Sequence, residues 1–236
     1  MAHLTGQERA DYVQSMFDRV AARYDLMNRL MTAGQDIAWR KYVIEKAAVP
    51  KGGRMLDIAT GTGDIAYEGI SQDPTIQAVG GDFSIGMMRA GKRDYPERNV
   101  IQWTGADALN LPFPDNYFDA SVSGFLMRNV IDVPRAFREQ LRVLKPGGRC
   151  VVLESSPPKD NLLKPFIMIH LNYVIPTIGQ LLTGQGDAYA YLPESTKGFR
   201  TPDDLASLMR EAGFLTVSYK LFMFGTVAIH FGRKPL

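Results

Sequence analysis

Acidic residues and glycines that could form a ligand site gather in residues 54–64 (RMLDIATGTGD). The apolar residues before the turn are typical of a buried parallel strand, so Asp57 lies at the carboxyl end of that strand. Gly61 and Gly63 allow a tight turn and a close approach of the backbone to a ligand. Asp64 is expected to cap the helix that follows. Two carboxylates here would repel a diphosphate and attract a cation, so the pattern predicts a positively charged ligand.

The position of a further acid indicates which ligand this is. Residues 61–66 (GTGDIA) also fit the loose dinucleotide fingerprint, which alone is a weak signal. Asp82 follows the next predicted strand about twenty residues after the glycines, the spacing at which an acid meets ribose hydroxyls. A nucleoside joined to an amino acid that carries a sulfonium group fits these charges better than a diphosphate does. We therefore predict S-adenosylmethionine as the cofactor and keep a nicotinamide dinucleotide as the alternative.

The elements that must position these residues alternate between helices and strands. Residues 7–47 have helical periodicity and form a helical N-terminal extension, within 1–50, that could act as a lid. Five strands alternate with helices, which predicts a doubly wound parallel α/β sheet of the Rossmann type. An antiparallel pair follows at the end of the chain and completes seven strands. The predicted strands are 54–59, 76–81, 100–103, 118–124, 149–153, 214–221 and 226–231. The predicted helices after the extension are 65–70, 84–90, 134–144 and 202–211, and Ser84 is expected to cap the second of them.

Residues 155–200 interrupt this alternation after the fifth strand. Their central part, 166–175 (FIMIHLNYVI), is apolar almost all round and is bounded by Pro165 and Pro176. One interpretation is a buried helical insertion. The other is a hydrophobic cap over an apolar substrate that also makes peripheral contact with a membrane surface.

Composition limits the remaining possibilities. The chain has 236 residues, 45% of them hydrophobic, which is ample for the core of a single domain over 1–236. A net charge of +2 is too small to indicate a nucleic-acid partner. One cysteine, Cys150, excludes an internal disulfide and suits a reducing compartment. No secretory signal and no apolar run of membrane-spanning length is evident. We expect a cytoplasmic protein that is soluble or peripheral to the inner face of the membrane.

Five passages resemble one known family. Residues 24–31 (YDLMNRLM), with Trp39 and Arg40 downstream, resemble its first signature, and residues 142–148 (RVLKPGG) resemble its second. Residues 59–64, 111–115 (LPFPD) and 128–130 (RNV) lie between them. The family is that of the quinone-biosynthesis C-methyltransferases, which act on demethylmenaquinol and on the benzoquinol precursor of ubiquinone. The resemblance covers nearly the whole chain and implies a class I methyltransferase fold.

The resemblance also assigns roles to residues. It implies that Thr62 and the neighbouring backbone hold the methionine part of the cofactor, that Asp82 holds the ribose, and that Asp107 and Ala108 hold the adenine. All of these positions follow predicted strands. Gly124 and the small residue at 155 look more like the menaquinone branch than the ubiquinone branch. Residues 125–129 (FLMRN) depart from the family's usual pattern beside the expected active site.

Methyl transfer to an aromatic carbon requires an electron-rich ring, best supplied by the phenolate of a quinol. Arg128, at the end of the fourth strand, could favour that phenolate electrostatically, and Asn129 could orient the same oxygen. A structural salt bridge is the alternative for Arg128. His170 and His230 are interpreted as a polar point in the cap and as a structural residue. Three scattered histidines and one cysteine give no metal-ligand spacing, so no metal site is predicted.

The leading functional hypothesis is an enzyme that methylates a polyprenylated naphthoquinol, demethylmenaquinol, to menaquinol. The same chemistry on the benzoquinol precursor of ubiquinone is the nearest alternative. An NAD(P)-dependent oxidoreductase and a non-enzymatic methyltransferase-like binding protein are the others, and ligand binding and turnover would distinguish them. Prenyl length, oligomeric state and the proton acceptor stay open.

Overall fold

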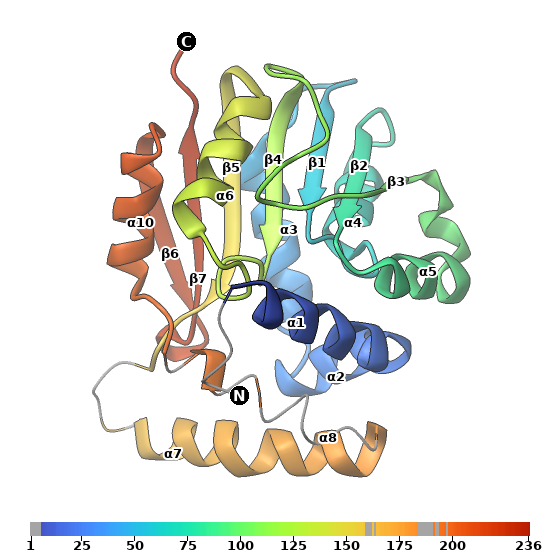
Figure 1. Cartoon of the computed structure of the whole chain (residues 1–236), viewed down its shortest axis with the longest axis vertical. Helices are drawn as coiled ribbons and strands as arrows, with labels where there is room; N and C mark the ends of the chain where they lie inside the picture. The colour runs from blue at the N-terminus through green and yellow to red at the C-terminus, as the bar shows by residue number, and fades with distance from the viewer. Residues whose placement is uncertain (1–5, 159–161, 163, 184–190, 192–193, 197) are drawn as a thin grey trace.

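The computed structural model describes residues 6–158, 162, 164–183, 191, 194–196 and 198–236. Its centre is a seven-stranded sheet in the order β3-β2-β1-β4-β5-β7-β6 (Figure 1). The first five strands are parallel, and β7 is antiparallel to both β5 and β6. This confirms the predicted doubly wound α/β sheet with an antiparallel end. The strands are β1 (Arg54–Ile58), β2 (Gln77–Asp82), β3 (Gln102–Gly105), β4 (Phe118–Gly124), β5 (Leu144–Ser155), β6 (Leu215–Phe222) and β7 (Val227–Arg233).

The central strands are buried on both faces, as their continuous apolar sequences require. Successive side chains of β1 point to opposite sides. Leu56 and Ile58 pack with the core against α6 (Val133–Val143) and α10 (Pro202–Glu211). Met55 packs with the core on the other face, against α3 (Asp36–Ala47) and α4 (Asp64–Gln72). The sheet is therefore a rigid platform from whose edge the functional loops extend.

Of the two predicted helix caps, Ser84 is confirmed and Asp64 is wrong. Ser84 caps α5 (Ile85–Asp94), as predicted, because its hydroxyl accepts a hydrogen bond from the Met87 N–H at 3.1 Å. Asp64 does not cap α4. Gly63, in a left-handed conformation with φ of 91°, is the N-cap residue, and the Asp64 side chain is turned toward two arginines instead. A 3₁₀ turn, η2 (Pro96–Val100), replaces the start of the predicted third strand.

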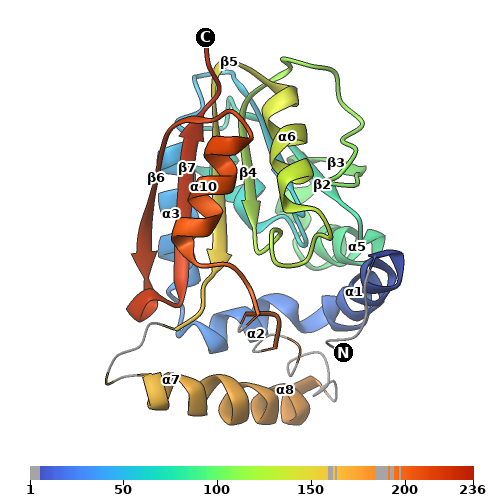
Figure 2. The same ribbon diagram turned by 60° about the vertical axis from the view of Figure 1, so that its left-hand side comes forward.

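The N-terminal extension is helical, as predicted, but its helices do two different things. They are α1 (Gly6–Val20), η1 (Ala21–Arg23), α2 (Tyr24–Met31) and α3. α3 packs on the sheet as part of the core, with Trp39 and Val43 buried. α1 and α2 lie across the carboxyl ends of the parallel strands, between the sheet and the helices α7 (Lys164–Ile169) and α8 (Ile175–Thr183) (Figures 1 and 2). Only the first part of the extension can therefore cover a ligand.

One predicted boundary in the sheet was wrong. The sequence places residues 145–148 at the end of the preceding helix and before the fifth strand, but β5 already begins at Leu144. Leu144 pairs with Phe118, and the register shifts before Arg149 pairs with Ala120. Gly147, with φ of 75°, supplies the left-handed residue inside this irregular strand. A Pro-Gly-Gly sequence thus marks a bulge as well as a turn.

The insertion after β5 contains one long helical stretch, made of α7 (Lys164–Ile169), the π-helical η3 (His170–Val174) and α8 (Ile175–Thr183). The sequence predicts that Pro176 bounds the apolar segment, yet the helix continues through it. The π-helical turn directly precedes the proline and accommodates its missing N–H. Most side chains of this stretch face outward, and Phe166, Tyr173 and Leu181 are among the most exposed. The interpretation as a buried insertion is therefore wrong for the described residues.

The same stretch, Lys164–Leu182, is long and apolar enough to cross a membrane by length and composition, so the expectation that no apolar run reaches this length was wrong. Its inner side is occupied, however. Leu171, Ile175 and Ile178 pack with Met16 and with other residues of α1 and α2. The helix therefore has an apolar inner side joined to the protein and an apolar outer side left exposed.

Candidate active site

Two cavities adjoin at the carboxyl ends of the strands, beneath α1 and α2. The α2 cavity, of about 190 Å³, reaches from the loop after β1 to α8, and the α5 cavity, of about 180 Å³, lies between β2, α5 and β4. Both are lined mainly by apolar atoms. They share the lining residues Phe17, Tyr24, Ala59, Gly61, Gly124 and Phe125. A ligand with two chemically different halves could therefore occupy both.

The shared wall is built from strained backbone. Ala59, after β1, and Phe125, after β4, have φ of 58° and 57°, a conformation that L-residues other than glycine seldom adopt. The Phe125 N–H donates to the Leu153 carbonyl at 2.7 Å, which holds the chain in this turn. Such strain persists only where the surroundings enforce it, and it is common at functional sites. Neither alanine nor phenylalanine favours this conformation, so the sequence does not predict it at either position.

The two predicted glycines have different roles. Gly61 lines both cavities, has φ of 58°, and donates its N–H to Asp82 Oδ2 at 2.7 Å. Gly63 lines neither cavity. A Cβ on Gly63 would come within 2.6 Å of the Trp103 ring, so this glycine is needed for packing as well as for its φ of 91°. Of the two glycines, Gly61 is therefore the one at which a ligand in these cavities could approach the backbone.

Asp57 presents an unsatisfied carboxylate oxygen. Its Oδ2 accepts hydrogen bonds from the Thr60 hydroxyl at 2.7 Å and the Ala66 N–H at 3.0 Å. Its Oδ1 is buried and has no hydrogen-bond partner among the described residues. Burial raises the pKa of Asp57 to about 7. A buried acceptor that lines the α2 cavity without a partner indicates that a donor, preferably a cationic one, belongs there.

Asp82, Asp107 and Ala108 come together in the α5 cavity, as their positions after strands predicted. Asp82 accepts the N–H of Gly61 and, at 2.7 Å, the N–H of Ser84. Burial also raises the pKa of Asp82, to about 6. Asp107 Oδ1 accepts the N–H of Leu109 at 2.9 Å. Each acid thus holds its own loop in place while lining a cavity that is otherwise mostly apolar.

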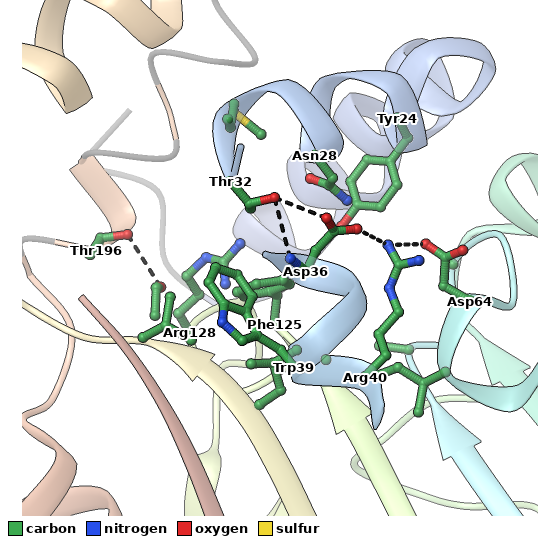
Figure 3. A pocket seen from close by; sticks show the side chains of 18 of the residues that line it. Tyr24, Asn28, Thr32, Asp36, Trp39, Arg40, Asp64, Phe125, Arg128 and Thr196 are labelled. Carbon is green, nitrogen blue, oxygen red and sulfur yellow. Dashed lines mark hydrogen bonds and ion pairs between the residues drawn. The ribbon is translucent and has the colours of Figure 1, made fainter. Parts of the chain in front are cut away.

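Asp64 belongs to a buried ion-pair network that was not predicted from the sequence (Figure 3). Its oxygens lie 2.6 Å from Arg40 Nη2 and 2.7 Å from Arg98 Nη2. The same Arg40 nitrogen lies 2.6 Å from Asp36 Oδ2, and the Thr32 hydroxyl donates to Asp36 Oδ1 at 3.0 Å. The charge of Asp64 is therefore balanced by two arginines. Of the two acids expected to repel a phosphate, only Asp57 has an unpaired oxygen.

Asp25 ties the covering helix α2 to the loop after β1. Its Oδ1 accepts the Thr62 hydroxyl at 2.7 Å, and its Oδ2 lies 3.2 Å from Arg98 Nη1, which also donates to the Thr62 carbonyl at 2.8 Å. The Thr62 hydroxyl is therefore engaged by the protein. Asp25 stands in the passage 24–31, where the family resemblance could have drawn attention to it. Arg98, in the turn before β3, has no such signal.

Arg128 follows β4, as predicted, and lies on the wall of the α2 cavity. It also forms a salt bridge, which the sequence analysis gave as its alternative role. Its Nη1 lies 2.5 Å from Glu154 Oε1, and its backbone N–H donates to Glu154 Oε2 at 3.1 Å. Its guanidinium stands over the Phe125 ring at 4.9 Å. Its Nε is buried without a partner among the described residues, so one donor is still available for a ligand.

Asn129 does not join Arg128. It lines the α5 cavity, donates from Nδ2 to the Phe125 carbonyl at 2.8 Å, and accepts the Tyr191 hydroxyl at 3.1 Å. His230 is buried and hydrogen-bonded to the Pro202 carbonyl at 2.9 Å, in keeping with a structural role. Within the described part of the chain, no three His, Cys, Asp or Glu side chains are grouped as metal ligands.

Solved structures show the class of fold. The fold matches a "SeMet Haemonchus contortus Phosphoethanolamine N-methyltransferase 2 in complex with S-adenosyl-L-methionine" with a TM-score of 0.64 and 16% identity, over 84% of this chain and 53% of that one. It also matches an S-adenosylmethionine-dependent methyltransferase from Thermotoga maritima, described as a possible histamine N-methyltransferase, with a TM-score of 0.64 and 19% identity, over 93% and 98% of the two chains. The fold is that of the class I methyltransferases.

Sequence comparison identifies the family. The model of the "ubiE/COQ5 methyltransferase family" matches residues 5–234. A "Ubiquinone/menaquinone biosynthesis C-methyltransferase UbiE" from Desulfotalea psychrophila is 48% identical over 94% of this chain and 90% of its own. A "Demethylmenaquinone methyltransferase" from Roseiflexus castenholzii is 43% identical over 96% and 95%. The chain belongs to the ubiE/COQ5 methyltransferase family, which confirms the resemblance and sets aside the oxidoreductase alternative.

The site fits the cofactor of such an enzyme. S-adenosylmethionine has a cationic amino acid half and a nucleoside half, and the two cavities offer an unpaired acidic oxygen on Asp57 and an acid, Asp82, in an apolar pocket. Gly61 lies where the two cavities meet. The protein is therefore an S-adenosylmethionine-dependent methyltransferase, as predicted.

Proposed function

We propose that this enzyme methylates a ring carbon of demethylmenaquinol, a polyprenylated naphthoquinol, to give menaquinol. The observation that carries the proposal is the wall of the α2 cavity. It is formed by apolar side chains of α1, α2 and the insertion helix, including Met16, Leu171 and Ile175. An apolar ring with a long apolar tail suits such a wall. Relatives with 42–43% identity carry the name demethylmenaquinone methyltransferase.

The cofactor residues follow from the two cavities. In this proposal Asp57 and the backbone of Gly61 and Thr62 bind the methionine half. Only backbone is assigned at Thr62, because its hydroxyl already donates to Asp25. Asp82 binds the ribose, and Asp107 with Ala108 borders the adenine, since all three line the α5 cavity. Gly63 supports the loop by its packing against Trp103 and is not assigned a contact.

The chemistry needs an electron-rich ring carbon facing an electrophilic methyl group, which S-adenosylmethionine supplies when it is bound. Arg128 favours the ionised form of a nearby phenol, because a positive charge lowers the pKa of an adjacent acid. Glu154 holds the guanidinium of Arg128 in place through Nη1. The Nε of Arg128 has no partner among the described residues and can donate to the substrate oxygen. Opposite charges are neutralised in the transition state, so an apolar cavity favours the reaction. Asn129 acts indirectly, by fixing Phe125.

The benzoquinol precursor of ubiquinone is the second candidate substrate. The relative from Desulfotalea psychrophila, at 48% identity, is named for both ubiquinone and menaquinone biosynthesis. The deciding experiment is turnover of a radiolabelled methyl donor with paired naphthoquinol and benzoquinol substrates that carry the same prenyl tail. Label in the naphthoquinol alone supports the proposal, and label in the benzoquinol alone contradicts it.

We further propose that the outer side of α7–α8 rests on the inner face of the cytoplasmic membrane, in the plane of the interface. Phe166, Tyr173 and Leu181 are 70%, 69% and 79% exposed. Since the inner side of this helix lines the α2 cavity, a helix that spanned the bilayer would dismantle the cavity. An interfacial position instead places the cavity beside the membrane in which a polyprenylated quinol dissolves.

Binding to phosphatidylethanolamine–phosphatidylglycerol vesicles tests this contact. The triple variant Phe166→Ser, Tyr173→Ser, Leu181→Ser should bind at least about tenfold more weakly, because each side chain would lose apolar burial in the lipid. Val100→Ser with Leu215→Ser is the matched control, since both residues are exposed and lie outside this helix. Equal sedimentation of the triple variant and the wild type with vesicles would refute the contact.

A further inference from the structure

Two hydroxyl groups on the wall of the α2 cavity are linked to a buried carboxylate. The Thr196 hydroxyl lies 3.3 Å from the Ser155 hydroxyl, and the Ser155 hydroxyl lies 3.1 Å from Glu154 Oε1. Both Thr196 and Ser155 line the cavity, and all three residues are buried. Figure 3 shows Thr196 on the side of the cavity where Arg128 lies, with the bond to Ser155 dashed. The binding of the cofactor and the activation of the ring use neither hydroxyl.

The carboxylate of Glu154, at the end of these hydrogen bonds, determines which group donates in each of them. Glu154 is ion-paired with Arg128, and a carboxylate can only accept. The single hydroxyl hydrogen of Ser155 is therefore directed to Glu154. Because that hydrogen is used, Thr196 must be the donor in the bond between the two hydroxyls. Both groups then offer only lone pairs to whatever occupies the cavity.

We propose that Thr196 and Ser155 form an acceptor-only wall that selects the reduced ring of the substrate over its oxidised form. This inference rests on the proposed quinol substrate. A quinol hydroxyl can donate to the wall. A quinone carbonyl has no hydrogen to donate and would place its lone pairs against those of the hydroxyls, leaving buried acceptors unsatisfied.

The apolar side chains of the cavity and Arg128 do not make this distinction, and Asp57 is assigned to the cofactor. The two forms of the ring have nearly the same size and apolar surface, so the side chains of Met16, Leu171 and Ile175 contact both equally. Arg128 is a donor and can serve an oxygen of either form. Rejection of a near-isosteric competitor depends on a polar group that is left unpaired by the wrong ligand. The hydroxyl pair is such a group, and it favours the form whose ring carbon is nucleophilic.

Dissociation constants measured without turnover test the proposal. The enzyme is loaded with S-adenosylhomocysteine, and a short-chain demethylnaphthoquinone is titrated both oxidised and, anaerobically, reduced. In the wild type the reduced form should bind about tenfold more tightly or better. In Thr196→Val, which keeps the shape and removes the acceptor, this preference should largely disappear, mainly through weaker binding of the reduced form. Thr196→Ser should restore the preference. Thr104→Val, on β3 outside both cavities, is the control and should keep the wild-type ratio.

The outcomes separate this inference from the proposed function. If the wild type neither binds nor methylates the naphthoquinol, the proposed function fails. If it methylates the quinol but folded Thr196→Val or Ser155→Ala keeps a preference within about twofold of the wild type, the hydroxyl pair is not the selective group. Ser155→Ala removes the second acceptor without enlarging the side chain, so its binding ratio decides the question if Thr196→Val does not fold.

Discussion

The α5 cavity and the α2 cavity are neighbours, but they are assembled from the chain in different ways. The acids of the α5 cavity are held by the loops of the sheet. Asp82 and Asp107 accept N–H groups two residues further along, and Asp82 also accepts the Gly61 N–H from the loop after the neighbouring strand β1. The α2 cavity depends on long-range bonds. Arg98 reaches Asp25 across 73 positions, and Thr196 reaches Ser155 across 41. The acids of the α5 cavity are thus held within the sheet's own loops, whereas polar groups of the α2 cavity are held by residues from distant parts of the chain.

The two cavities also treat charge differently. In the α5 cavity, Asp82 is stabilised by backbone dipoles. In the α2 cavity, Asp64 and Glu154 are paired with arginines, and Asp57 keeps one oxygen unpaired. Cofactor recognition can rest on local loop geometry, whereas control of a reacting ring needs charges held from several directions. Substitutions at Arg128, Asp57 and Asp25 test this division, and we expect the effects to decrease in that order.

Replacement of Arg128 should separate chemistry from cofactor binding. We expect Arg128→Met to lower kcat by about 100-fold or more, since it removes a charge that stabilises developing negative charge, while the Kd for S-adenosylmethionine changes by less than about threefold. Loss of the partner also leaves Glu154 unpaired and should cost about 3–5 kcal/mol of folding free energy, so thermal unfolding is followed in parallel. Arg128→Lys, which keeps the charge, should retain more activity than Arg128→Met.

Arg138→Met, which replaces an exposed arginine on α6, is the matched control and should leave kcat unchanged. If Arg128→Met kept full turnover, the salt bridge with Glu154 would be the whole role of Arg128. If it instead lost cofactor affinity and activity in equal measure, the proposed division between the two cavities would be wrong.

Replacement of Asp57 should make the ligand-free protein more stable and cofactor binding weaker. The pKa of Asp57 is raised from 3.8 to about 7 in the folded protein. Between these pH values the folded state keeps a proton that the unfolded chain has released, so stability falls as pH rises from about 4 to about 7. An asparagine side chain cannot ionise and avoids this loss. Above pH 7, Asp57→Asn should therefore be more stable than the wild type by about 2–4 kcal/mol.

Urea unfolding of both proteins from pH 4 to pH 8.5 measures this difference, which should vanish near pH 4. Calorimetry should show weaker binding of S-adenosylmethionine to Asp57→Asn, because the unpaired oxygen that would receive its cationic half has lost its charge. Asp94→Asn, at an exposed carboxylate, is the control and should not gain stability in this way. If the free energies of unfolding of Asp57→Asn and the wild type changed with pH in the same way, the raised pKa of Asp57 would be contradicted.

The sheet and the α5 cavity could be predicted from the sequence because both depend on short-range patterns. Alternation of apolar strands and helices predicts a doubly wound parallel sheet. An acid that follows a strand must lie at the carboxyl edge, which placed Asp82 and Asp107 correctly. Arg128 could be placed on the same grounds. The spacing of residues in the sequence does not predict that Glu154 is the partner of Arg128. It also does not decide whether Arg128 has an electrostatic or a structural role.

Long-range pairing could not be predicted in this way. The sequence favours Asp64 as a cap because N-terminal helix positions prefer acids, and tertiary contacts with Arg40 and Arg98 override that preference. The left-handed backbone of Ala59 and Phe125 likewise has no signature in non-glycine residues. In the insertion, apolarity all round is equally compatible with burial and with an exposed cap. The exposure of its outer side, opposite the inner side that packs on α1 and α2, separates the two.

A more modest effect is expected at the bond between the covering helices and the cofactor loop. Asp25, on α2, joins the Thr62 hydroxyl and Arg98, and it is the contact by which α2 meets that loop. We expect Asp25→Ala to raise the Kd for S-adenosylmethionine by about three- to tenfold, since the charge-assisted hydrogen bonds from Thr62 and Arg98 to this carboxylate, which order the loop, are lost. Arg98 keeps its bond to Asp64, so no buried arginine is left without a partner.

Calorimetry gives the affinity of Asp25→Ala, and limited proteolysis of α1–α2 with and without S-adenosylhomocysteine reports whether the helices loosen. Glu8→Ala, at an exposed acid on α1, is the control. If Asp25→Ala binds the cofactor and resists protease as Glu8→Ala does, then the covering helices are held by apolar packing alone. The α2 cavity would then depend less on its long-range ion pairs than the contrast with the α5 cavity implies.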